Sequence, residues 1–182
     1  MITICLTVID SEQDRSRFLK IYENHKDLMH FVARRVLGDD QLAEDAVQEA
    51  FINVAKNFDR IKSLDENHMK NLLAVLARIE SISLLRKEGR YKYNESIEAD
   101  DSFNEIPADD DTFSEAHYLL LKEAILKLPD NYRNLLYLVG VCELDIKDAA
   151  GMMHISYETA KKRIQRSRKL MEKIIGGNYD DK

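Results

Sequence analysis

The sequence lacks tryptophan and has few of the residues that interrupt regular secondary structure. Its 182 residues include only two prolines, six glycines and two cysteines. This scarcity of proline and glycine favours long helices over a β architecture with many turns. Cys5 and Cys142 stand far apart, so they have neither the spacing of a metal site nor the density of a disulfide framework. We interpret both as ordinary reduced thiols.

Long apolar runs are also missing. No stretch approaches the roughly 18 to 20 uncharged apolar residues that a membrane-spanning helix needs. The segment MITICLTVID has a short apolar run, but no basic residue precedes it and no small-residue cleavage site follows it. The sequence therefore predicts a cytoplasmic protein with no membrane span and no signal peptide.

Catalytic and metal-binding motifs are not recognisable either. The five histidines show no metal-ligand spacing among themselves or with the cysteines. No glycine-rich phosphate loop or nucleophile motif is present. We therefore predict that the chain is not an enzyme and holds neither a metal nor a cofactor.

The negative charge is concentrated in the middle of the chain. The formal net charge is −6, and residues 96–127 alone carry 9 acidic and 2 basic side chains. The segment NESIEADDSFNEIPADDDTFSEAH has too few apolar residues to offset the entropy lost on ordering, which predicts a mobile linker. The prediction is an all-α fold with two small helical domains. The predicted ranges are 1–93 for the first domain, 94–113 for the linker, 114–176 for the second domain and 177–182 for a disordered tail.

Helix signals are clear in the first domain. Ser11 is a candidate cap for a helix through RFLKIYENHKDLMHFVARRVL that ends at Gly38. Asp39 and Asp40 are candidate caps for the next helix, and a third apolar helix is predicted over 69–85. The apolar stripe of the second helix follows the 3.6-residue period. Its members are Ala43, Val47, Ala50, Phe51, Val54 and Phe58.

The opposite side of that second helix is acidic. Asp45, Gln48 and Glu49 lie there with an apolar Ile52 and with Lys56. An acidic amphipathic surface of this kind suits a basic protein partner. A solvated face on a core helix explains the same pattern equally well.

The second domain predicts a helix-turn-helix. A helix over FSEAHYLLLKEAILKL is followed by Pro129, which suits a helix start, and by a helix over DNYRNLLYLVGVC. DIKDAAGMM, the break HIS and YETAKKRIQRSRKLMEKII then predict two helices joined by a tight turn.

The last of these helices is strongly basic. Six of the nine residues from Lys161 to Lys169 are basic. With Ser156 as the cap, one face is predicted to pack on the preceding helices through Ala160, Ile164, Ser167, Met171 and Ile174. The other face can neutralise DNA phosphates and read base edges in the major groove, as the second helix of such a motif usually does. A merely solvated basic face is the alternative.

Two segments carry a family resemblance. LAEDAVQEAFINVAKNFDRI resembles the region 2 signature of extracytoplasmic-function sigma factors. LPDNYRNLLYLVGVCELDIKDAAGMMHISYETAKKRIQRSRKL resembles their region 4. The resemblance covers about Phe18 to Leu170; the first motif is specific, whereas many transcription regulators share the second. It implies a dissociable promoter-specificity subunit of bacterial RNA polymerase, which would work in the cytoplasm and reach the nucleoid through the polymerase.

The resemblance also implies partners and site residues. The acidic helix would dock on a coiled coil of the largest core polymerase subunits, through Asp45, Gln48, Glu49 and Ile52. The basic helix would read the minus-thirty-five duplex through Glu158, Thr159, Lys161, Lys162, Gln165, Arg166 and Lys169. Candidates for the melted minus-ten strand are Arg60, Lys62, Asn67, Arg86, Arg90 and Tyr91. An anti-sigma factor that holds both domains is a further implied partner.

This chain departs from the family at three places. The family commonly has a Trp and then an Asn in the helix that helps to hold the minus-ten strand, where this chain has Leu72 and Ile79. His154 stands where the family often has a small turn residue. The first two departures leave open how the minus-ten strand is held.

Two other functions stay open from the sequence. A stand-alone helix-turn-helix regulator of transcription would explain the basic helix, but it leaves the acidic helix unexplained. A helical interaction protein without a nucleic-acid role explains neither the separation of charges nor the order of the two motifs.

Overall fold

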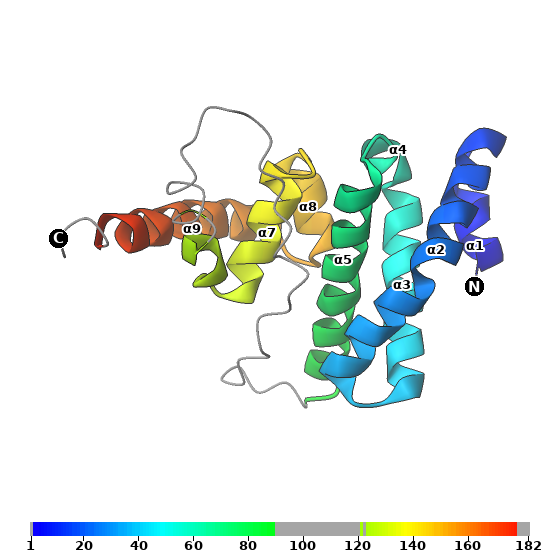
Figure 1. Ribbon diagram of the computed structural model, residues 1–182, viewed down its shortest axis with the longest axis horizontal. Helices are drawn as coiled ribbons and strands as arrows, with labels where there is room; N and C mark the ends of the chain where they lie inside the picture. The colour runs from blue at the N-terminus through cyan, green and yellow to red at the C-terminus, as the bar shows by residue number, and fades with distance from the viewer. Residues whose placement is uncertain (1, 90–120, 122, 178–182) are drawn as a thin grey trace. The chain divides into compact units, whose positions relative to one another are not determined.

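The fold is helical in every element that the structure describes. The structure is a computed structural model, and it describes residues 2–89, 121 and 123–177. The chain divides into two compact units, Met1–Glu98 and Ala99–Lys182. The described residues contain helices and no strands (Figure 1). The predicted linker, 94–113, lies outside the described residues, and its boundaries remain predictions.

Three long helices form the body of the first unit. They are α2 (Glu12–Leu37), α3 (Asp40–Lys56) and α5 (Glu66–Lys87). Each of the three contacts the other two, and Figure 1 shows them running side by side. A short helix, α4 (Phe58–Ile61), follows α3.

Side-chain caps set the helix boundaries in this unit. Ser11 Oγ accepts a hydrogen bond from Asp14 N at 3.0 Å, and Asp39 Oδ1 accepts one from Leu42 N at 2.9 Å. Gly38 ends α2 with a φ of 69°, the left-handed conformation that favours glycine. Asp65 caps α5 through His68 N, so this helix begins at Glu66, one turn before the predicted start. The predicted caps Ser11, Gly38 and Asp39 are confirmed.

Aromatic rings fill the core between α2 and α3. The ring of Phe18 meets the rings of Phe51 and Phe58 edge-on, with centroids 6.1 and 5.6 Å apart. Full burial of a Phe side chain is worth roughly 1.5 to 3 kcal/mol. The predicted stripe is buried throughout, but Phe58 belongs to α4, because α3 ends at Lys56. The Asn57 side chain turns back to donate to Asn53 O at 2.9 Å, which helps to end the helix.

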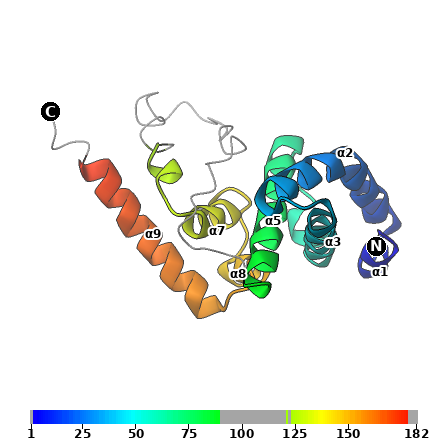
Figure 2. The same cartoon turned by 90° about the horizontal axis from the view of Figure 1, so that it is seen from below.

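The first helix, α1 (Ile2–Val8), was not predicted from the sequence. This helix contacts α3 and lies beside it in Figure 2.

Both cysteines are buried. Cys5 lies in α1 and Cys142 in the second unit, and both thiols are free. Burial raises the pKa of the Cys142 thiol to about 12. Both cysteines are therefore inert thiols of the core.

The second unit is a smaller helical cluster. It contains α7 (Asp130–Gly140), α8 (Ile146–Met152) and α9 (Tyr157–Gly177), which contact one another. Of the helix predicted before Pro129, the structure describes the end, with helical residues at 121 and 123–126. The buried guanidinium of Arg133 pairs with Asp130 and donates to Leu126 O at 3.3 Å, which fastens this helix end to α7. Leu135, Leu138 and Met152 are fully buried in this unit.

Among the described helices, none combines the length and the apolar character needed to cross a membrane.

Two exposed glycines allow a matched test of the helix boundaries. Apart from the adjoining backbone and the neighbouring residues in the chain, no atom lies within 4 Å of the position that a Cβ would take at Gly38 or at Gly151. Gly38 has a left-handed backbone, so Gly38→Ala is expected to destabilise the first unit by about 1 kcal/mol. Gly151 lies within α8, so Gly151→Ala is expected to stabilise the second unit by up to about 1 kcal/mol.

Hydrogen exchange of the full chain in increasing denaturant, resolved for the α2 and α8 amides, measures both effects separately. A change of the same sign at the two glycines would contradict this account of α2 and α8.

Candidate nucleic-acid and protein interfaces

The basic face of α9 is exposed along its length. Ser156 caps the helix: its Oγ accepts from Thr159 N at 3.2 Å, and its carbonyl accepts from Ala160 N at 3.0 Å. Ala160, Ile164 and Ser167 are buried, whereas Met171 and Ile174 are half-buried. The predicted DNA-facing residues are exposed except Thr159, which is half-buried. The exposed set is Glu158, Lys161, Lys162, Gln165, Arg166 and Lys169.

A tight turn connects α8 to α9. Ile155 N donates to Ala150 O at 3.0 Å and His154 N donates to Gly151 O at 3.1 Å, the two bonds of a Schellman motif. His154 occupies the left-handed position of this motif with a φ of 53°, where glycine is usual. Both α7 and α8 contact α9. The helix is therefore braced on its buried side, and its basic face is exposed.

One exposed aromatic on α9 is not among the residues predicted to face DNA. Tyr157 is the first residue of the helix and is 46% exposed, next to Glu158. The N-terminal residues of a recognition helix are those that contact base edges. An aromatic directly after a helix cap was the sequence signal that could have identified this position.

The acidic face of α3 is formed as predicted. Asp45 and Glu49 are exposed, and Gln48 and Ile52 are half-buried. The opposite stripe is buried in the unit, where α3 contacts α1, α2 and α5. The face combines negative charge with a partly accessible apolar side chain. This combination suits a basic amphipathic helix as a partner.

The segment from 57 to 65, here called the α3–α5 connection, lies against α2. Lys62 Nζ is 2.9 Å from Asp14 Oδ2 and 2.9 Å from Asp59 Oδ1. Arg17 Nη2 donates to Leu64 O at 3.2 Å. Phe58 and Ile61 of the connection are buried. The ammonium of Lys62, predicted to contact a nucleic-acid strand, is therefore already held by two carboxylates.

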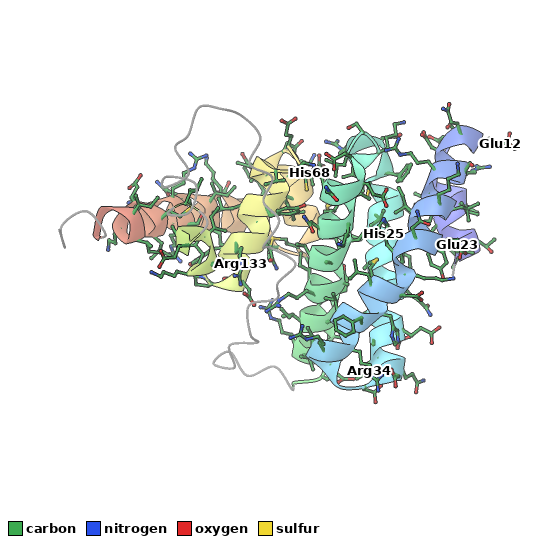
Figure 3. All side chains as sticks on the ribbon, in the orientation of Figure 1. Glu12, Glu23, His25, Arg34, His68 and Arg133 are labelled. Carbon is green, nitrogen blue, oxygen red and sulfur yellow. The ribbon has the colours of Figure 1, made fainter. Side chains whose placement is uncertain are left out.

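Two histidines lie near the start of α5: His68 belongs to its first turn, and His25 belongs to the neighbouring helix α2 (Figure 3). His68 Nδ1 is 2.6 Å from Asp65 Oδ2, which adds a second bond to the helix cap. The buried His25 on α2 has its Nε2 3.0 Å from Glu66 Oε1, a close contact without hydrogen-bond geometry. The first contact lies at the N-terminus of α5, and the second brings α2 close to the first residue of α5.

The remaining candidates for strand contact differ in accessibility. Arg60 and Asn67 are exposed, and so is Arg86 near the end of α5. Arg90 and Tyr91 lie outside the described residues. Leu72 is fully buried and Ile79 is 7% exposed, so these two α5 positions are parts of the core. Accessible side chains at the two ends of α5 are thus the candidates that the structure presents.

The described part of the chain contains no group of three or more His, Cys, Asp or Glu side chains that could hold a metal ion.

Comparison with known proteins identifies relatives along most of the chain. Residues 21–91 match the model of Sigma-70 region 2, and residues 118–171 match that of Sigma-70 region 4. The ECF RNA polymerase sigma factor SigW of Bacillus subtilis is 31% identical over 172 residues, which cover 89% of this chain and 90% of that protein. The ECF RNA polymerase sigma factor SigM of the same organism is 28% identical over 166 residues, covering 89% and 97%.

One solved structure also aligns with the chain. It is the sigma factor RpoE in complex with the anti-sigma factor NepR from Bartonella quintana. The alignment has a TM-score of 0.41 and 20% identity, and it covers 91% of this chain and 98% of that one.

Proposed function

The chain belongs to the extracytoplasmic-function family of RNA polymerase sigma factors, and from that premise we propose how its two units divide the work of transcription initiation. The first unit binds core RNA polymerase and engages the melted minus-ten strand. The second unit reads the minus-thirty-five duplex. The observation that supports this division is the presence of an exposed acidic helix face on one unit and an exposed basic helix face on the other.

Core binding is assigned to the acidic face of α3. The proposed partner surface is a coiled coil of the largest core subunits. Asp45 and Glu49 supply charges that steer a basic partner, and Ile52 supplies apolar area at the centre of the contact. Gln48 offers both a donor and an acceptor. The same charges repel DNA phosphates, so this face suits a protein partner better than nucleic acid.

Duplex reading is assigned to α9. Lys161, Lys162 and Lys169 suit phosphate contacts, whose binding free energy comes largely from counterion release. Gln165 and Arg166 suit bidentate contacts with base edges, and Glu158 can accept from a cytosine amine. Thr159 is half-buried, next to the cap, and its hydroxyl lies 2.8 Å from Ser156 Oγ. A contact between the Thr159 hydroxyl and DNA would therefore compete with its hydrogen bond to Ser156.

Strand engagement is assigned to the accessible polar residues around α5. The proposed set is Arg60 and Asn67 near the start of the helix, Arg86 near its end, and Arg90 and Tyr91 beyond it. Leu72 and Ile79 are core residues and take no part. A melted base needs a polar or aromatic surface on which to bind or stack. The α3–α5 connection, with Arg60, supplies the polar part in this proposal.

Two further parts of the proposal follow from the role in initiation. The polymerase carries the chemistry, so the chain itself needs no cofactor and acts in the cytoplasm, at the nucleoid. An anti-sigma factor is the proposed regulator. It would cover the acidic and basic faces, and so block both partners at once.

A reconstitution experiment tests the proposal as a whole. Purified protein is expected to bind bacterial core polymerase with one-to-one stoichiometry and to direct transcripts from defined start sites. Sequencing the transcripts made in vitro from genomic DNA would identify the promoters. Binding to duplex DNA without any binding to core would instead favour a stand-alone helix-turn-helix regulator.

Charge reversal on α3 should weaken core binding selectively. Glu49→Lys, and more strongly Asp45→Lys with Glu49→Lys, is expected to lower core affinity by about tenfold or more, because like charges would oppose a basic partner. Asp27→Lys, an exposed reversal on the outer side of α2, is the matched control. Fluorescence titration with core measures the affinity. Equal losses for Glu49→Lys and Asp27→Lys would place docking elsewhere.

Removal of basic side chains from α9 should affect promoter use and spare core affinity. Lys162→Ala is expected to weaken promoter binding uniformly and to reduce the salt dependence by about one ion, as expected for a phosphate contact. If Arg166 reads a base, Arg166→Ala should cost about 1 to 3 kcal/mol and relax the preference at that base.

Lys127→Ala is the matched control for both α9 variants, since Lys127 is exposed outside the helix-turn-helix and pairs only locally with Glu123. Holoenzyme binding to promoter variants at several salt concentrations measures these effects. The assignment to α9 would fail if the Lys162 and Arg166 variants bound promoters as the control does.

A further inference from the structure

Two contacts attach the α3–α5 connection to α2. The side chain of Lys62 places its Nζ 2.9 Å from Asp14 Oδ2. Two residues later, Leu64 O accepts a hydrogen bond from Arg17 Nη2 at 3.2 Å. Asp14 and Arg17 stand close together near the start of α2, 48 and 47 residues away from their partners. The backbone between Lys62 and Leu64 is therefore held at two points by one helix.

The contact between Asp14 and Lys62 is partly shielded from water. The side chain of Asp14 is 19% exposed and that of Lys62 is 38% exposed. The hydrogen bond from Lys62 lowers the pKa of the Asp14 carboxyl below its ordinary 3.8, and the bonds to Asp14 and Asp59 raise the pKa of Lys62 above 10.5. Both groups are thus charged at neutral pH.

Apolar contacts beneath the connection support the two polar anchors. Phe58 and Ile61 are buried, and the ring of Phe58 packs edge-on against Phe18 of α2. Surface connections are usually mobile. A single exposed ion pair would change that little, because such pairs contribute small free energies. Here the buried side chains of Phe58 and Ile61 already hold the connection against the rest of the unit. The ion pair and the hydrogen bond then need only to favour one local backbone conformation over the others.

We propose that Asp14, Arg17 and Lys62 are positioning residues that hold the α3–α5 connection in one conformation and thereby set the base preference for the melted minus-ten strand. The inference rests on the proposed function of the first unit. It assigns Lys62 a contact with the protein in place of the contact with the minus-ten strand for which it was a candidate. It also assigns a role to Asp14 and Arg17, which precede the region 2 match at residues 21–91.

The physical reason is preorganisation. A connection that is already ordered pays no further entropy when the strand binds, and it offers its polar groups in one arrangement. A base that fits this arrangement gains over the others. A loosened connection can adapt to several bases, so discrimination decreases more than total affinity does.

Asp14→Asn and Asp59→Asn form a matched pair for the test. Each substitution removes one carboxylate charge from Lys62. Of these two carboxylates, only that of Asp14 belongs to α2, since Asp59 lies within α4 and is 82% exposed. Reconstituted holoenzyme is incubated with fork-junction DNA whose single-stranded minus-ten positions are randomised. Sequencing of bound DNA then measures the ratio of preferred to other bases at each position.

Asp14→Asn and Arg17→Gln are expected to lower the base-preference ratio by about two- to fivefold, the effect of one partly exposed pair. Asp59→Asn is expected to keep the wild-type ratio. Lys62→Arg should keep the ratio because it retains the charge, and Lys62→Gln should lower it. Core affinity should be the same for all five variants, because the acidic face of α3 is untouched.

The alternative role of Lys62, a direct phosphate contact, makes a different prediction. Lys62→Gln would then weaken binding to all sequences equally and reduce the salt dependence, while Asp14→Asn would leave the base preference unchanged. That combination would overturn the inference.

Failure of the proposed function can be recognised separately. A photo-crosslinker placed at residue 63 in otherwise unchanged protein is expected to label the single-stranded minus-ten DNA in the holoenzyme complex. Absence of this crosslink, together with wild-type base preference in every variant, would refute strand engagement by the connection. A strong crosslink with unchanged preference in Asp14→Asn and Arg17→Gln would refute only the positioning role.

Discussion

The burial of one stripe of α3 between α2 and α5 is the constraint on which the arrangement of the first unit depends. Ala43, Ala46 and Ala50 are fully buried, and their small side chains allow neighbouring helices to approach closely. Because the helix is rigid, its rotation is set once this stripe is buried. Asp45 and Glu49 then have to face outward. The same logic applies to α9, where buried Ala160, Ile164 and Ser167 direct Lys162 and Arg166 outward.

The two faces carry opposite charge, and the net charge of the chain describes neither of them. At physiological ionic strength a surface charge acts over about 8 Å, so each face presents its own sign to a partner. An acidic face with an apolar centre suits a basic protein partner, whereas a basic face on a braced helix suits duplex DNA. This is the physical basis for assigning protein binding to one unit and duplex binding to the other in a sigma factor of this family.

The proposed contacts with the melted strand do not involve the middle of α5. Leu72 and Ile79, which stand where the family resemblance implies strand-holding side chains, are both buried. The accessible polar groups lie instead at the two ends of α5 and in the connection before it. That connection is attached to α2 through Lys62 and Leu64, so its shape depends on residues distant in the sequence.

The sequence by itself determined the local features of the fold. Ser11, Asp39 and Gly38 marked helix ends because capping depends only on neighbouring residues, and the 3.6-residue period identified the buried and exposed sides of α3 and α9. The exposed sides identified by this period are the candidate faces for core and duplex binding.

Only the tertiary structure decided the contacts between distant segments. It showed α1 against α3, Phe58 in a separate helix, and the partners of Lys62 and Leu64 on α2. A charge pair across 48 residues leaves no periodic pattern, because it depends on how two helices meet in space. For that reason the sequence suggested Lys62 as a strand contact, whereas the folded chain shows it bound to Asp14 and Asp59.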